Sequence, residues 1–221
     1  KNSIKIIGEE TDNYAQGYFV YDSKKAGAMT VSHLRFGKSP IRSPYLIKQA
    51  NFIACHNPSF LEKYDMLAHA EPGGTFLLTS SHSADEVWDT LPHEVQKQLI
   101  DKKMKFYVID AIRIAEDLGL GARINVIMQT AFFKISSVID IDTAVKAIKN
   151  AIVKTYGKKG EKVVKMNVDA VDQALDKIYE VKIPAEATSK THIAVPVPAD
   201  APQFVQEVTA AIMSGHGDDI P

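Results

Sequence analysis

The stretch GGTFLLTSSHSADE, residues 73–86, places an apolar strand directly before the start of a helix. Two glycines open it, and the apolar run over 73–80 has the length and composition of a strand. Ser83 and Glu86 then have the spacing of a capping box, in which both side chains satisfy backbone N–H groups at a helix start. A strand followed at once by a helix is the repeating unit of a parallel sheet.

The same alternation extends in both directions along the chain. Further strands are predicted at 18–22, 28–36, 51–57 and 105–110. Helices are predicted after the Asn57 cap and Pro58, after Ser83 with a break at Pro92, at 111–121 with a glycine end, at 142–156 and at 161–179. Residues 123–136 are apolar nearly all round, so they form a buried helix or a strand-to-helix segment. Together these units predict an α/β fold, a three-layer α/β/α arrangement with a largely parallel sheet.

From residue 182 the chain becomes rich in proline, which disfavours helices and central strands. We therefore expect two parts: an α/β domain over 1–181, and an extended Pro-rich arm with a short terminal helix over 182–221. The chain opens without an initiator Met, inside an element that reads as structured, which suggests a fragment of a longer protein.

The composition excludes several classes of protein. Net charge is −1, so no global field draws the chain to nucleic acid or anionic lipid. Cys55 is the single cysteine, so neither a disulfide framework nor a cysteine-ligated iron–sulfur cluster can form within the chain. No apolar run approaches the roughly 18 residues of a membrane span, and a cytoplasmic location is expected.

Candidate ligand residues lie where predicted strands end, because ligands of parallel sheets bind beyond the carboxyl ends of the strands. Lys24 and Lys25 follow the strand at 18–22 and could meet a phosphate as point charges, or form an ordinary solvated turn. The sequence GLGARIN, residues 119–125, is a tight turn into a helix start or simply a helix end followed by another helix. Asn125 stands out as an amide in an apolar run, which predicts a buried, hydrogen-bonded side chain.

Other polar residues do not form a recognisable catalytic set. No two histidines have the four-residue spacing of a helical zinc site, and adjacent Cys55 and His56 point to opposite faces of a strand. The serines of residues 79–83 lack the G-x-S-x-G context of a hydrolase nucleophile. The sequence therefore predicts no catalytic residue in this chain.

Ordered blocks along the chain resemble the large homodimeric pyruvate:ferredoxin (or flavodoxin) oxidoreductases. These blocks are KNSIKIIGEETD, AQGYFVYDSKKAG, TVSHLRFG, SPYLIKQANFIACHNPSFL, GGTFLLTS, ADEVWDTLP, GLGARINVIMQTAFF and YGKKGEKVVKMNVDAVDQAL. Residues 183–203 add nothing specific, and TSSHSADE departs from the more apolar or Pro-containing stretch expected there. The resemblance is to the third domain of these enzymes, equivalent to the gamma subunit of split 2-oxoacid oxidoreductases.

The resemblance implies a role in a larger enzyme that converts pyruvate and coenzyme A to acetyl-CoA and CO₂ and reduces ferredoxin or flavodoxin. Thiamine diphosphate with Mg and the [4Fe-4S] clusters would belong to other domains of the same polypeptide, and the full protein would be a homodimer. The third domain would bind coenzyme A and close it over the active centre.

Site residues follow from the resemblance by motif. Lys24 in YDSKK would meet a coenzyme phosphate, with Lys25 as a weaker helper, and Asn125 in ARINV and Asn167 in VKMNVDA would add hydrogen bonds. A Gly-rich, phosphate-cradling turn is expected just before residue 1, so residues 2–12 would continue its helix with Ile4 and Ile7 buried.

Two competing interpretations remain. In one, the domain only braces the thiamine diphosphate domains and the dimer, with the Pro-rich arm tying neighbours together. In the other, the chain is a free-standing nucleotide-binding Rossmann protein; against this, G-x-G-x-x-G and an acidic residue about 20 positions later are both missing.

Overall fold

A mixed four-stranded sheet forms the centre of the protein in the computed structural model, which describes residues 2–21 and 29–220, with the backbone alone for Asp219. Its strands lie in the order β3 (Ala50–Cys55), β4 (Ala70–Thr79), β5 (Lys105–Ile109) and β6 (Tyr179–Val181). β3, β4 and β5 are parallel, and β6 pairs with β5 in the antiparallel sense. The α/β class and the mostly parallel sheet are confirmed, whereas the three-residue β6 was not predicted.

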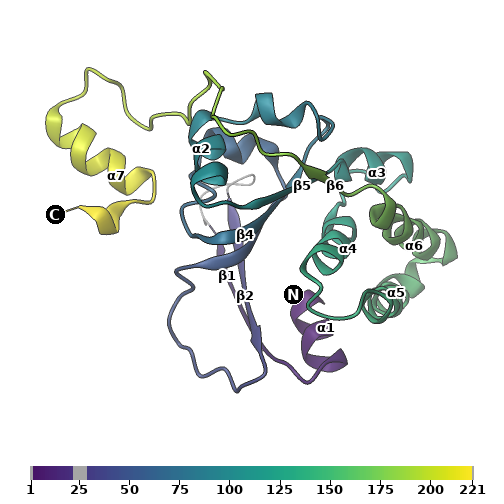
Figure 1. Cartoon of the computed structure of the whole chain (residues 1–221). Coiled ribbons are helices and arrows are strands. Elements are labelled where there is room, and N and C mark those ends of the chain that lie inside the picture. Colours follow the sequence, from purple (N-terminus) through teal and green to yellow (C-terminus); the bar gives the residue numbers. More distant parts are fainter. Residues whose placement is uncertain (1, 22–28, 221) are drawn as a thin grey trace.

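Alternate residues of the central strands enter two different cores. Phe76, Leu78 and Phe106 pack on one side with residues of α2 (His93–Asp101) and of the short 3₁₀ helix η2 (Val87–Thr90). Leu77 and Ile109 pack on the other side with residues of three helices, α3 (Ala111–Asp117), α4 (Asn125–Ser136) and α6 (Glu161–Asp176). Helical elements therefore cover both faces of the sheet (Figure 1).

The first two predicted strands form a separate hairpin. β1 (Tyr14–Tyr21) and β2 (Thr30–Gly37) pair antiparallel along their whole length and are not hydrogen-bonded to the central sheet. The prediction that the strand at 18–22 belongs to the parallel sheet is therefore wrong. In the sequence Lys24 follows a strand of the hairpin and not one of the parallel sheet. The rule that ligands bind beyond the carboxyl ends of parallel strands therefore does not apply to Lys24.

A third apolar cluster packs the N-terminal helix against α4, α6 and a further helix, α5 (Ile141–Tyr156). Ile6 and Ile7 of α1 (Asn2–Glu10) are buried with Phe133, with Ile148 of α5 and with Val171. The helix expected over residues 2–12 is confirmed. Its buried pair is Ile6 and Ile7, while Ile4 is only half-buried against the hairpin.

Two local signals were correct in type but not in extent. Asn57 caps a helical turn, yet η1 (Pro58–Glu62) is a single 3₁₀ helix and not the long helix predicted. Both the backbone N–H and the Oγ of Ser83 donate to Glu86, at 3.2 and 2.8 Å, but only short turns follow before α2. The break expected at Pro92 separates η2 from α2.

The Pro-rich segment runs as an extended chain over the surface. Residues 188–194 lie on α2 and beside η1; Gln96 accepts hydrogen bonds from the N–H groups of Thr188 and Ser189, and Glu62 accepts one from Ala194. A short helix follows, comprising the π-helical turn Val205–Thr209 and α7 (Ala210–Met213), and then the 3₁₀ turn Gly217–Asp219. None of the helices in the described ranges is long and apolar enough to cross a membrane.

Candidate functional site

The N-terminal helix lies along the hairpin, and this contact sets its direction. A Cβ atom placed on Gly17 would lie 2.0 Å from Cδ1 of Ile4, and one on Gly8 would lie 3.8 Å from Cβ of Ala15. α1 and β1 are therefore antiparallel. The N-terminal end of α1 is directed toward Tyr21, the last residue of β1.

The beginning of α1 also contacts the first half of α4. Gln129 Nε2 donates to Ser3 Oγ at 3.0 Å, and Asn2 Nδ2 donates to Gln129 Oε1 at 3.4 Å. Sequence reasoning overlooked Gln129, although it is a second amide in the apolar run that drew attention to Asn125. These contacts bring the N-terminal parts of two helices together.

The N-terminus of α4 has no side-chain cap among the described residues. Ile124, the residue before the helix, makes no capping hydrogen bond through its side chain, and Gly119 and Gly121 shape the preceding loop with φ values of +72° and +60°. The first N–H groups of a helix have no partner within it and carry the positive end of the helix dipole. Arg123 and Asn125 are both exposed beside them.

Asn125 is the first residue of α4, and the prediction that its amide is buried is wrong. The apolar run that surrounds it in sequence faces the core through Ile127 and Met128, whereas position 125 faces outward. An exposed amide at a helix start can donate and accept hydrogen bonds without movement of the core.

Asn167 lies in a different environment. It is 4% exposed, and its Nδ2 donates to the carbonyl oxygen of Val163 at 2.8 Å within α6. It belongs to the stripe that α6 buries, together with Ala170, Val171 and Ala174. Its burial is thus explained by helix packing and a hydrogen bond to its own helix.

The two asparagines lie toward the same end of a helix pair. Lys134 near the end of α4 donates to the carbonyl oxygen of Leu175 near the end of α6, and a Cβ on Gly119, before α4, would lie 3.2 Å from the methyl group of Met166. α4 and α6 therefore run in the same direction. Asn125 begins α4, and Asn167 lies in the first half of α6.

Lys24 and Lys25 lie outside the described residues, within the 22–28 segment that links β1 to β2. The nearest described pair is Tyr21 and Thr30, the last matched residues of the hairpin. The segment therefore starts from the strand end toward which the N-terminus of α1 is directed.

Residues at the carboxyl ends of the central strands serve the fold. Asp110 caps α3 by accepting from the N–H of Arg113 at 3.0 Å, and Thr79 Oγ1 accepts from the N–H of Ala111 at 3.2 Å. Burial raises the pKa of the Cys55 thiol to about 11, and a hydrogen bond with the backbone of Asn57 opposes the shift only in part. Within 2–21 and 29–220, no three His, Cys, Asp or Glu side chains are grouped so that they could hold a metal ion.

Comparison with known proteins gives matches over the whole chain. Residues 2–177 match the family model described as pyruvate ferredoxin/flavodoxin oxidoreductase, and residues 190–221 match a domain of unknown function, EKR. The chain is 56% identical to the pyruvate:ferredoxin oxidoreductase of Moorella thermoacetica and 51% identical to a probable pyruvate-flavodoxin oxidoreductase of Escherichia coli. Each match covers 100% of this chain but 19% of the relative, so the chain spans about a fifth of their length.

Solved structures share the fold at low sequence identity. A pyruvate oxidoreductase subunit from Thermotoga maritima aligns with a TM-score of 0.63 at 17% identity, covering 82% of this chain and 91% of that subunit. The 2-oxoglutarate:ferredoxin oxidoreductase from Magnetococcus marinus, solved with 2-oxoglutarate, coenzyme A and succinyl-CoA bound, aligns with a TM-score of 0.57 at 15% identity over 87% of this chain and 30% of that protein. Because the family model matches residues 2–177, which are most of this chain, the chain belongs to the pyruvate ferredoxin/flavodoxin oxidoreductase family.

Proposed function

We propose that this chain is the coenzyme-A-binding domain of a pyruvate:ferredoxin/flavodoxin oxidoreductase. The whole enzyme would convert pyruvate and coenzyme A to acetyl-CoA and CO₂ and pass the electrons to ferredoxin or flavodoxin. The observation that supports the proposal is the contact of Ser3 in α1 with Gln129 in the first half of α4, because α1 runs antiparallel to β1 and this contact therefore lies toward the Tyr21 end of the hairpin.

Coenzyme A fits such an arrangement because its 3′-phosphate and pyrophosphate carry several negative charges. Helix N-termini attract anions through free N–H groups and the helix dipole. Lys24 would add a point charge, with Lys25 as a weaker second cation. Asn125, exposed at the start of α4, is free to orient a polar part of the ligand.

Asn167 fits the site less well than Asn125. Its side chain is buried, and one of its N–H groups is already used within α6. A direct contact between coenzyme A and Asn167 would need neighbouring side chains to move. We retain Asn167 as a residue that acts from beneath the site through the packing of α6 on α4.

The remaining cofactors would be held by other parts of the longer polypeptide. Cys55 is the single cysteine, and its buried thiol has a pKa of about 11, so it is a poor thiolate ligand for a cluster. We propose that thiamine diphosphate with Mg and the [4Fe-4S] clusters lie outside residues 1–221. Within the chain, 1–181 would form the gamma-type domain, without the Gly-rich turn expected before it, and 182–221 the arm.

The test is steady-state kinetics of the full-length enzyme carrying Lys24→Ala. A charge-assisted contact contributes on the order of 1.5–3 kcal/mol, so the KM for coenzyme A should rise about tenfold or more, with the KM for pyruvate little changed. Lys48→Ala is the matched control, because Lys48 is an exposed lysine of the same N-terminal region. An unchanged KM for coenzyme A in Lys24→Ala would contradict the assignment.

A second candidate function is structural bracing of neighbouring domains. It is favoured by large apolar side chains that stay exposed on the hairpin and on the loop after it, namely Tyr21 at 70%, Tyr45 at 66% and Leu46 at 64%. Calorimetric titration of the full-length protein with coenzyme A separates the two functions. Heat of binding that Lys24→Ala abolishes supports the coenzyme site, whereas the absence of heat in the unaltered protein supports bracing alone.

A further inference from the structure

The terminal helix carries apolar side chains that stay exposed among the residues the structure describes. Over the described residues from 182 to 220, no side chain is buried. Phe204 is 68% exposed, and Ile212 and Met213 are each 60% exposed. Phe204, Val208 and Ile212 recur at the four-residue spacing that places side chains along one face of a helix. An uncovered apolar helix face of this kind indicates a docking surface.

The arm fixes where this helix begins. The N–H of His93 donates to the carbonyl oxygen of Thr191 at 2.8 Å, and the N–H of Ala194 donates to that of Glu62 at 2.8 Å. The chain is therefore attached to α2 and η1 up to residue 194. Beyond that point the terminal helix lies at the opposite end of the molecule from α5 and α6 (Figure 1).

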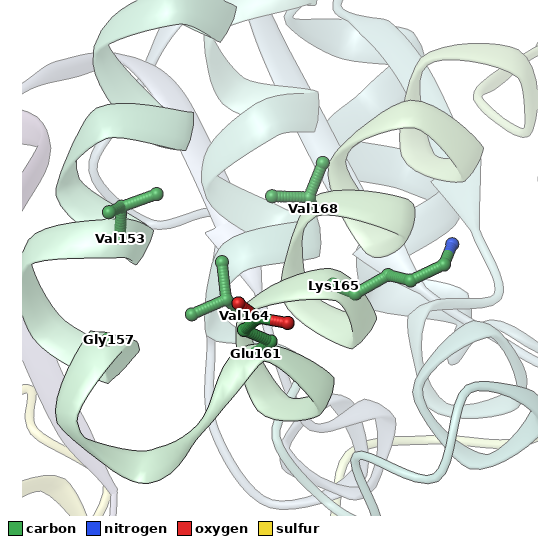
Figure 2. A pocket seen from close by; sticks show the side chains of 6 residues that line it. All are labelled: Val153, Gly157, Glu161, Val164, Lys165 and Val168. Atoms are coloured by element: carbon green, nitrogen blue, oxygen red, sulfur yellow. The ribbon is translucent and has the colours of Figure 1, made fainter.

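An apolar groove lies between α5 and α6 at that opposite end. Val153 of α5 and Val164 and Val168 of α6 line it, and Gly157 leaves one end of it without a side chain (Figure 2). The hollow measures about 330 Å³, and Val153 is 55% exposed within it. A hollow lined by apolar side chains between two helices is the kind of site into which a third helix can place its apolar face.

The chain segments that carry the two surfaces differ in charge, although Lys165 is itself paired with Asp169 at 2.9 Å. Residues 191–221 contain no lysine or arginine and four acidic residues, which are Asp200, Glu207, Asp218 and Asp219. Residues 153–168, which supply the groove, contain one acidic residue and five lysines, which are Lys154, Lys158, Lys159, Lys162 and Lys165. Glu161 and Lys165 belong to the groove lining itself. Such complementarity favours one partner and discourages like-charged ones.

We propose that the terminal helix of one copy docks into the α5–α6 groove of a second copy of this chain. The helix supplies Phe204 and Ile212 as apolar anchors, and the groove supplies the valine floor with its lysine-rich border. Docking within one copy would require the arm to leave α2 and cross the molecule. Docking between copies keeps the arm in place, and the exchange can be reciprocal, as a two-fold dimer requires.

The decisive experiment is site-specific photo-cross-linking in the full-length protein. Phe204 is replaced by a benzophenone amino acid, light and heavy isotope-labelled copies are co-assembled, and the adducts are mapped by mass spectrometry. The expected product joins position 204 of one isotope to residues 153–168 of the other. Adducts confined to one isotope, adducts to a different segment, or no adduct to 153–168 would each overturn the proposal.

Two variants test the chemistry of the contact. Val153→Asp places a charge in the groove at a position that is 55% exposed, and should remove the adduct while circular dichroism shows that the protein stays folded. Glu207→Lys and Lys165→Glu should each lower the yield about two- to fivefold, as expected for exposed charges at the border. Yields unaffected by all three substitutions would refute the contact. The same cross-linker at Tyr45, which is 66% exposed on the loop after the hairpin, should give no adduct to 153–168.

Discussion

The side chain of Gln96 joins the extended arm to the core, accepting a hydrogen bond from the N–H of Thr188 at 2.8 Å. The same Oε1 also accepts from the N–H of Ser189 at 2.9 Å, while Nε2 donates to the carbonyl oxygen of Trp88 at 2.7 Å. Gln96 is fully buried, so these partners cannot be replaced by water without rearrangement. One amide therefore holds together the arm, α2 and η2.

Substituting Gln96→Leu should destabilise the protein and release the arm. The N–H groups of Thr188 and Ser189 lose their partner, while the carbonyl oxygen of Trp88 keeps the N–H of Leu91 at 3.2 Å, and an unsatisfied buried group costs about 1–3 kcal/mol. We expect a loss of about 2 kcal/mol in the free energy of unfolding, measured by urea denaturation, and faster hydrogen exchange at Thr188 and Ser189. Lys97→Ala on the exposed side of the same helix should cost less than about 0.5 kcal/mol. Equal losses in the two variants would contradict this role of Gln96.

The attachment of the arm should weaken in acid. Burial opposes ionisation of Glu94, but the hydrogen bonds from His192 at 2.8 Å and from the N–H of Ile193 at 3.1 Å outweigh it, so the pKa of Glu94 is lowered. A carboxyl whose pKa is lower in the folded state stabilises that state above its ordinary pKa of 4.5, and the contribution is lost as the pH falls through the lowered value.

The measurement is the thermal unfolding midpoint as a function of pH. Near neutral pH the unfolding midpoint of the unaltered protein should be higher than that of Glu94→Gln. The difference between the two midpoints should shrink as the pH falls below about 4.5. Asp85→Asn, at an exposed carboxyl, should leave the profile unchanged. If the difference in unfolding midpoint between the unaltered protein and Glu94→Gln stayed constant over the pH range, ionisation of Glu94 would not contribute to the stability of the folded state.

Gly17→Ala should push α1 away from the hairpin. The added Cβ would meet Cδ1 of Ile4, the end of a side chain that can turn away, and would lie 3.2 Å from the less movable carbonyl oxygen of His33, so we expect a cost of about 1 kcal/mol, at the low end for overpacking. Gly37→Ala is the matched control, because no atom lies within 4 Å of its added Cβ. Adding Ile4→Ala should restore part of the lost stability. If the proposed coenzyme site is correct, Gly17→Ala also raises the KM for coenzyme A.

Cys55 should be unreactive in the folded protein. Its side chain is fully buried, and its pKa of about 11 leaves very little thiolate at neutral pH. Iodoacetamide at neutral pH, followed by peptide mapping, should leave Cys55 unmodified until denaturant is added. Modification under native conditions at the rate of an exposed thiol would show that β3 opens readily.

Elements whose signals are local could be predicted from the amino-acid sequence. The apolar runs of β3, β4 and β5 and the 3.6-residue periodicity of α5 and α6 lie within single segments, and so do the glycine end of α3 and the break at Pro92. Hydrogen bonds and side-chain spacing inside such segments are fixed by neighbouring residues, which a sequence displays directly. The motif resemblance added the family and the start of the chain as a helix.

Which elements contact one another became visible only in the folded protein. The separate β1–β2 hairpin, the contact of Gln129 with Ser3 and the attachment of Thr188 by Gln96 join residues far apart in the chain. Asn125 and Asn167 look alike as polar residues in helical segments, yet one faces outward and the other is packed inside. Contacts of this kind form only when burial of apolar surface offsets the entropy of closing long loops, so no local pattern records them.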